Sequence, residues 1–136
     1  MPKIDWNDSF GVGNDEIDRQ HKKWIGIFND LHDAMLNDDL TDYRAMTTQS
    51  LQDMLDYAKV HFAFEEKYMA NIGYPDLVAH RRLHKDFDTQ IYQCYRDAED
   101  GHTVLNTKII KMVRNWLVQH IMIEDMKYKL FAQQRG

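Results

Sequence analysis

Two pairs of polar residues at helical spacing stand in the middle of the chain. His61 and Glu65 are four residues apart in HFAFEEKYM, and His80 and His84 are four apart in HRRLHKDF. Residues at i and i+4 of a helix lie on the same face, one turn apart, so each pair can direct two metal-binding groups to one point. The break NIGYPD between them predicts that the two helices fold back antiparallel, with the pairs facing each other.

Two further segments add groups of the same kind. DRQH ends at His21, and HIMIED contains His120 and Asp125. Imidazole with a few carboxylates suits iron, and also manganese, copper or zinc. Structural zinc closes at four ligands, commonly with cysteine, and calcium or magnesium prefers oxygen donors, so none of these accounts for the set. We therefore predict a two-metal site, with iron favoured, on His21, His61, Glu65, His80, His84, His120 and Asp125.

A purely structural role for these residues is the main alternative. A single histidine on an apolar helix face is more often a core residue that bonds to a neighbour. Each buried polar group without a partner costs about 1–3 kcal/mol. Seven at one level of a bundle would cost about 7–21 kcal/mol, against about 5–15 kcal/mol for the stability of a whole domain. Coordination to cations would remove this cost, so we favour a metal site.

The proposed ligands leave room for a small molecule. If Glu65 and Asp125 each bridge two octahedral irons, and a solvent-derived oxygen also lies between the irons, all but one coordination position is filled. If three of the histidines complete one iron, the open position falls on the iron that the other two hold.

The spacing of His120 and Asp125 conflicts with a regular helix. Five residues are roughly 140° around an α-helix of about 3.6 residues per turn. Both side chains can face the site only if they straddle the helix face, or if the helix widens by a single π turn, a feature often found at functional sites. We predict one or the other between residues 120 and 125.

Apolar residues recur at alternating threes and fours along four segments, the period of a helix with one buried face. The first segment follows a cap at Asn14 or Asp15, the second ends at Gly73, the third begins at Pro75 and the fourth runs to about Phe131. The short breaks predict an all-α fold, an antiparallel up-down-up-down four-helix bundle, after an irregular N-terminal arm over residues 1–13. The expected buried faces include the proposed ligands together with Ile17, Leu51, Phe87, Val113 and Ile123.

Length and composition limit the class of protein. The 136 residues suit a single domain over residues 1–136. The net charge of −5, with no local cluster of Lys and Arg, argues against nucleic acid as a partner. No apolar run approaches the roughly 20 residues of a membrane span, and the N-terminus has no signal-peptide pattern. Cys94 is the only cysteine, so we expect no internal disulfide and a cytoplasmic location. The sequence shows no long apolar surface stripe, so we expect a monomer.

These motifs and their order resemble the hemerythrin family, in particular its single-domain bacterial members. The match covers nearly the whole chain: a Trp-containing arm, DRQH, HFAFEE as H-x-x-x-E, HRRLH as H-x-x-x-H and HIMIED as H-x-x-x-x-D. Each motif alone occurs by chance, but the four in this order are specific. The resemblance implies a four-helix bundle around a non-haem di-iron centre, bridged by an oxo or hydroxo group, that binds dioxygen reversibly.

The resemblance also implies a role for each proposed ligand. His21 and His61 match the two-histidine iron, and Glu65 and Asp125 match the bridging carboxylates. The three-histidine iron is matched by His80, His84 and His120.

The function that the resemblance implies is that of an oxygen-binding carrier, not an enzyme. Such a protein stores or transports dioxygen, or delivers it to an oxygen-consuming enzyme. Two alternatives are an oxygen or redox sensor and a di-iron oxidase or peroxidase. Sensors of this family are fused to signalling domains, and we recognise none in this sequence. Oxygen-activating di-iron enzymes generally use more carboxylates, because anionic oxygens stabilise high-valent iron, so five histidines with two carboxylates favour the carrier.

The residues one turn from the proposed ligands are mainly apolar. We expect Trp24, Phe28, Trp116 and Leu117 to line the oxygen side, with Leu117 the strongest candidate. A dry pocket without an additional acid would limit proton delivery to bound oxygen. The alternative is that these side chains only fill the core. Three other residues are expected to be structural or exposed rather than ligands: His32, Cys94 and His102.

Overall fold

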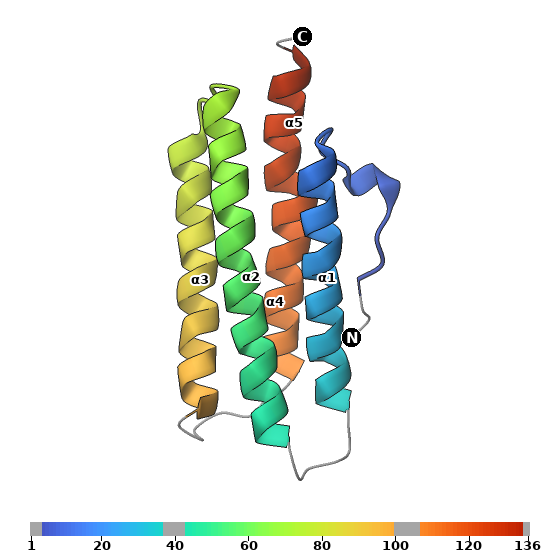
Figure 1. Cartoon of the computed structure of the whole chain (residues 1–136), viewed down its shortest axis with the longest axis vertical. Helices are drawn as coiled ribbons and strands as arrows, with labels where there is room; N and C mark the ends of the chain where they lie inside the picture. The colour runs from blue at the N-terminus through green and yellow to red at the C-terminus, as the bar shows by residue number, and fades with distance from the viewer. Residues whose placement is uncertain (1–3, 37–42, 100–106, 135–136) are drawn as a thin grey trace.

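The computed structural model describes residues 4–36, 43–99 and 107–134, and in these ranges the regular structure is helical. The helices are α1 (Asp15–Leu36), α2 (Tyr43–Asn71), α3 (Leu77–Glu99), α4 (Thr107–Gln119), a π turn η3 (His120–Glu124) and α5 (Asp125–Gln134). The last three form one continuous rod, so four rods alternate in direction (Figure 1). The predicted antiparallel four-helix bundle is confirmed.

The N-terminal arm lies against the outside of the bundle, beside α1 (Figure 1), and contains a short 3-10 helix, η1 (Asp8–Phe10). The backbone N–H of Ile4 donates to Asn29 Oδ1 at 3.0 Å, and Asn29 Nδ2 donates to the Ile4 carbonyl at 3.0 Å. Close to α1, the N–H of Val12 donates to Asp18 Oδ1 at 2.8 Å. Both ends of the described arm are therefore fixed to the first helix.

The helix ends follow local sequence signals, with one correction. Asn14 caps α1, because its side-chain oxygen accepts the N–H of Ile17 at 3.0 Å. Gly73 has a φ of 72°, in the left-handed region that glycine adopts without strain, and the chain leaves the helical path there. Pro75 was predicted at the first position of the third helix and lies two residues before it instead, because Asp76 takes the cap position.

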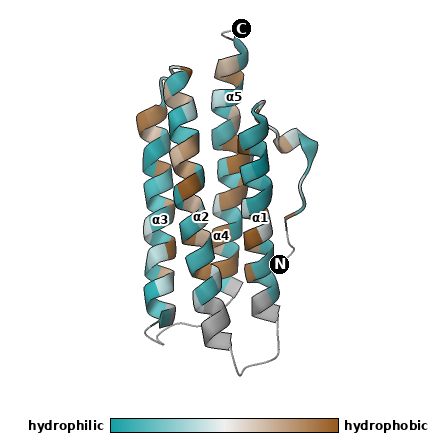
Figure 2. Ribbon diagram, viewed as in Figure 1, coloured by the Kyte–Doolittle hydropathy of each residue, from teal (hydrophilic) through white to brown (hydrophobic). Residues whose placement is uncertain are grey.

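Two apolar clusters fill the bundle, on opposite sides of a polar level. In α1, Ile17 of one cluster precedes His21 by one turn, and Trp24 of the other cluster follows it by one turn. The smaller cluster also includes Tyr128 of α5. Hydrophilic residues cover much of the outward helix surface (Figure 2). The larger cluster includes Phe28, Leu31, Leu51, Met54, Phe87, Ile91, Val113 and Leu117.

The predicted buried faces are confirmed in all four rods, except for one residue. Ile17, Leu51, Phe87 and Val113 are fully buried, but Ile123 is 48% exposed. Ile123 lies inside the π turn, which holds one residue more than an α-helical turn. The buried position therefore moves along the chain, and Asp125 occupies the buried face instead of Ile123.

None of the described helices is both long enough and apolar enough to cross a membrane.

The π turn provides a test of how α5 is held in register. Deleting Ile123 should leave a regular α-helix with α5 in its present orientation, and the free energy of unfolding should change by less than about 1 kcal/mol. Inserting an alanine after Ile123 should turn Tyr128 out of the core and lower the free energy of unfolding by about 3–5 kcal/mol, as for loss of a buried aromatic side chain. Urea unfolding followed by circular dichroism measures both; equal stability of the two variants would contradict this account.

Candidate metal centre

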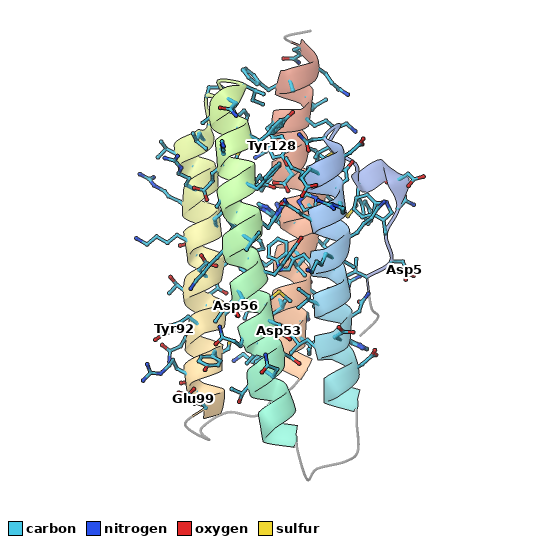
Figure 3. The ribbon with its side chains drawn as sticks, in the orientation of Figure 1. Asp5, Asp53, Asp56, Tyr92, Glu99 and Tyr128 are labelled. Carbon is cyan, nitrogen blue, oxygen red and sulfur yellow. The ribbon has the colours of Figure 1, made fainter. Side chains whose placement is uncertain are left out.

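The structure brings all seven predicted ligands together at one level of the bundle. They come from α1, α2, α3, the π turn and the first residue of α5. Polar side chains gather between the helices just below the labelled Tyr128 in Figure 3. None of the seven is more than 3% exposed: His21, His61, Glu65, His80, His84, His120 and Asp125.

Glu65 lies at the centre of this cluster and presents its two oxygens to different histidines. Its Oε1 lies 2.9 Å from Nε2 of His80, 2.9 Å from Nε2 of His84 and 3.1 Å from Nε2 of His120. Its Oε2 lies 3.2 Å from Nε2 of His61 and 3.5 Å from Nε2 of His21. One carboxylate therefore faces two groups of imidazoles.

Asp125 repeats this division from the opposite rod. Its Oδ2 lies 2.9 Å from Nε2 of His21, whereas its Oδ1 lies 3.1 Å from Nε2 of His80 and 3.2 Å from Nε2 of His120. The π turn makes this possible, because it places Asp125 on the same helix face as His120 although five residues separate them. Of the two predicted solutions to that spacing, the structure uses the π turn.

Several of these close contacts do not have hydrogen-bond geometry. Both ring nitrogens of His21 and His120, Nε2 of His61 and both Asp125 oxygens have no hydrogen-bond partner among the described residues. Buried polar atoms nearly always have a partner, so convergent atoms of this kind fit ligands around a shared cation. Two sets have ligand atoms within 4.8 Å of one another and could each hold an ion: His21, His61, Glu65, His120 and Asp125; and Glu65, His80, His84 and His120.

The electrostatics of the cluster favour positive charge between the carboxylates. Burial would lower the pKa of His21 and His80, but contacts with Asp125 and Glu65 outweigh it and raise each pKa to about 9. Burial lowers the pKa of His61. Burial would raise the pKa of Glu65, but the surrounding histidines, His120 and His61 first, hold it well below its usual range. The Glu65 carboxylate therefore remains charged and requires positive charge beside it.

Three residues that contact the cluster were not predicted from the sequence. Nδ1 of His61 lies 2.9 Å from Gln20 Oε1, and Nδ1 of His84 lies 2.9 Å from Glu66 Oε2. The hydroxyl of Tyr128 donates to Glu65 Oε2 at 3.2 Å. Gln20 and Glu66 belong to the DRQH and HFAFEE motifs, and each is adjacent in sequence to a proposed ligand. That adjacency is the sequence feature that could have indicated their role.

Tyr128 also corrects the expectation of a pocket without an additional acid. Its side chain is fully buried, and its phenol is in direct contact with Glu65. Burial and the nearby carboxylates raise its pKa well above the usual value, so it remains protonated and acts as a hydrogen-bond donor near neutral pH.

Two of the four predicted pocket residues, Trp24 and Trp116, contact ligand imidazoles. The Trp24 ring centroid lies 5.1 Å from that of His61, and Trp116 stacks on His120 at 4.6 Å with an interplanar angle of 17°. Leu117 is fully buried and borders a small, entirely apolar cavity beneath the N-terminal arm. The remaining residue is Phe28, whose ring lies 6.4 Å from that of His32 in the larger apolar cluster.

The cover of the cluster includes one aromatic residue outside that prediction. Phe62 stacks on His84 with ring centroids 3.9 Å apart and planes within 4°. His32 is buried outside the ligand cluster, and Cys94 is partly buried against the larger apolar cluster. His102 lies outside the described residues.

The sequence and fold are similar to those of known proteins. A family model described as hemerythrin HHE cation binding domain matches residues 12–132. The chain is 33% identical to a bacteriohemerythrin from Stenotrophomonas maltophilia, over 94% of this chain and 80% of that protein. It is 33% identical to a hemerythrin-like protein from Naegleria gruberi, over 93% of this chain and 91% of that protein. A crystal structure of wild-type hemerythrin matches with a TM-score of 0.85 at 29% identity, covering 94% of this chain and 96% of that chain.

The raised pKa values of two histidines predict that metal binding releases protons. Each pKa of about 9 lies above the ordinary value of 6.5, so His21 and His80 are protonated at pH 7 in the metal-free protein. A bound cation needs the neutral imidazole, so about two protons should be released per chain at pH 7, falling toward zero above pH 9. Calorimetry in buffers of different ionisation enthalpy measures this number.

The same values determine how the stability of the metal-free protein depends on pH. A histidine whose pKa is higher in the folded than in the unfolded protein stabilises the fold. That stabilisation is complete below about pH 6.5 and is lost as the pH rises through about 9. Urea unfolding of the metal-free protein should therefore show lower stability at pH 9.5 than at pH 6.5. No proton release at pH 7, with unchanged stability across this range, would contradict the assignment.

Proposed function

The chain belongs to the hemerythrin family, and we propose that it binds dioxygen reversibly at a pair of non-haem irons held by the seven buried residues. The observation that carries this proposal is the orientation of Glu65 and Asp125. Each carboxylate directs one oxygen to one group of histidines and its second oxygen to the other group. A carboxylate placed in this way can bridge two cations. A site for a single cation would not need two such carboxylates.

Each side chain then has a role in holding the irons. Glu65 and Asp125 would contribute to holding both irons, and His21 and His61 would hold one of them. The bound irons supply the electrons that dioxygen accepts. The other iron would be held by His80, His84 and His120.

The side chains around the site exclude water. Trp24, Phe62 and Trp116 pack against ligand imidazoles, and Leu117 is buried one turn before His120; none of the four carries an ionisable group. The phenol of Tyr128 keeps its proton, because its pKa is raised well above the usual value. Without a ready proton donor beside the site, release of unchanged dioxygen is favoured over its release as hydrogen peroxide, which would need added protons.

This chemistry supports a carrier rather than an enzyme. The cluster contains five imidazoles and two carboxylates, and neutral nitrogen donors stabilise high-valent iron less than anionic oxygens do. We propose that the protein stores dioxygen or delivers it to an oxygen-consuming enzyme, and that it acts as a monomer.

Metal analysis combined with optical spectroscopy tests the proposed function. The anaerobically reconstituted protein should contain two irons per chain, acquire a visible absorption band on exposure to oxygen, and lose it again on degassing over repeated cycles. Steady oxygen consumption in the presence of a reductant would indicate an oxidase instead, and an iron content of one or fewer per chain would refute the two-iron site.

A polar group at Leu117 should shorten the lifetime of the oxygenated protein. In Leu117→Ser the hydroxyl can form a hydrogen bond worth about 1–1.5 kcal/mol and so assist proton delivery, which corresponds to an autoxidation rate about tenfold higher. The decay of the oxygenated absorption band measures this rate. Leu117→Met, which keeps an apolar side chain of similar volume, is the control. If the serine and methionine variants have the same autoxidation rate, Leu117 does not limit proton delivery to the site.

A further inference from the structure

Two of the histidines are connected to the protein surface through their second ring nitrogens. Nδ1 of His61 donates to Gln20 Oε1 at 2.9 Å, and Gln20 Nε2 donates to Glu16 Oε1 at 3.1 Å. Arg19 pairs with the same Glu16. Because the Gln20 carboxamide oxygen can only accept, Nδ1 is the His61 nitrogen that carries the hydrogen when Nε2 is left free to bind a cation.

The connection from the other group of histidines is different in chemistry. Nδ1 of His84 donates directly to a carboxylate oxygen, Glu66 Oε2, at 2.9 Å. The other oxygen of Glu66 accepts from Nε of Arg81 at 3.0 Å. His84 therefore donates to a charged acceptor. His61 donates to a neutral amide, and the carboxylate of Glu16 is reached only through Gln20.

This difference affects how strongly each imidazole binds a cation. A hydrogen bond to an ionised acceptor is roughly twice as strong as one between neutral groups. A carboxylate on the outer nitrogen makes the inner nitrogen of a ligand histidine more basic. His84 should therefore be the better electron donor of the two.

The hydroxyl of Tyr128 adds to the same asymmetry. It donates to Glu65 Oε2, the oxygen that faces His21 and His61, and so reduces the electron density available on that side. Three imidazoles surround Oε1 and two surround Oε2. The number of imidazoles, the outer acceptors and the phenol all favour the same position.

We propose that the two metal positions have unequal affinity, that Glu66 and Gln20 contribute to the difference, and that the position beside His80, His84 and His120 fills first. Glu66 and Gln20 are positioning residues that act through His84 and His61. This inference rests on the proposed function only in requiring two cations; it does not require that oxygen binds.

Stepwise addition of Co²⁺ to the metal-free protein measures the two affinities. Calorimetry with a competing chelator should resolve two binding steps in the natural sequence. Crystals grown with one equivalent of Co²⁺ should show an anomalous difference peak beside His80, His84 and His120.

Exchanging the two acceptors tests what sets the order. Glu66→Gln should weaken the first step about 10–100-fold, and Gln20→Glu should strengthen the second step by a similar factor. The double variant should bring the two affinities closer together, by about the product of the two single effects. Asp56→Asn is the matched control, because Asp56 (labelled in Figure 3) is an exposed carboxylate of α2 that accepts a hydrogen bond from Gln52. Its two steps should stay within about threefold of those of the natural sequence.

Three results would overturn the inference: two steps of equal affinity, a first ion beside His21 and His61, or affinities that Glu66→Gln and Gln20→Glu leave unchanged. Binding of one ion or none to the natural sequence would refute the two-metal site itself, and with it the proposed function. If Glu66→Gln does not fold, as judged by its thermal melt, the Gln20→Glu variant alone still decides.

Discussion

Two carboxylates are buried completely among five imidazoles, and the rest of the structure depends on how that charge is compensated. Glu65 and Asp125 have no exposed surface, and the surrounding histidines hold the pKa of Glu65 low. Buried charge of this kind is stable only next to opposite charge. In the metal-free protein, protonated His21 and His80 provide it; divalent cations would provide it more fully. The bundle supplies these partners from separate rods at a single level.

This polar level determines how the core is built and where a helix departs from regularity. Apolar clusters pack on both sides of it, so the ligands are held from above and below by side chains with few alternative positions. In the fourth rod, an imidazole and a carboxylate have to face the same point. The π turn achieves this, and as a consequence Ile123 is turned toward solvent. The site therefore explains both the irregular backbone of the π turn and the exposure of Ile123.

The sequence predicted the parts of this arrangement that depend on local spacing. The period of the apolar residues defined four helices and placed the seven polar residues on their buried faces, and the angle between His120 and Asp125 required a π turn or a straddled face. The roles of Gln20, Glu66 and Tyr128 could not be predicted, because they contact residues 41, 18 and 63 positions away. Those contacts depend on the relative height and rotation of packed helices. The prediction that Ile123 is buried was wrong, because it continued the regular α-helical period through the π turn.

Diffraction at the iron absorption edge, from crystals of the iron-loaded protein kept under oxygen-free conditions, tests the central claim most directly. The account predicts two anomalous peaks, one on each side of the Glu65 carboxylate, with the five imidazoles divided between them. A single peak with a complete set of ligands, or iron bound away from Glu65 and Asp125, would contradict it.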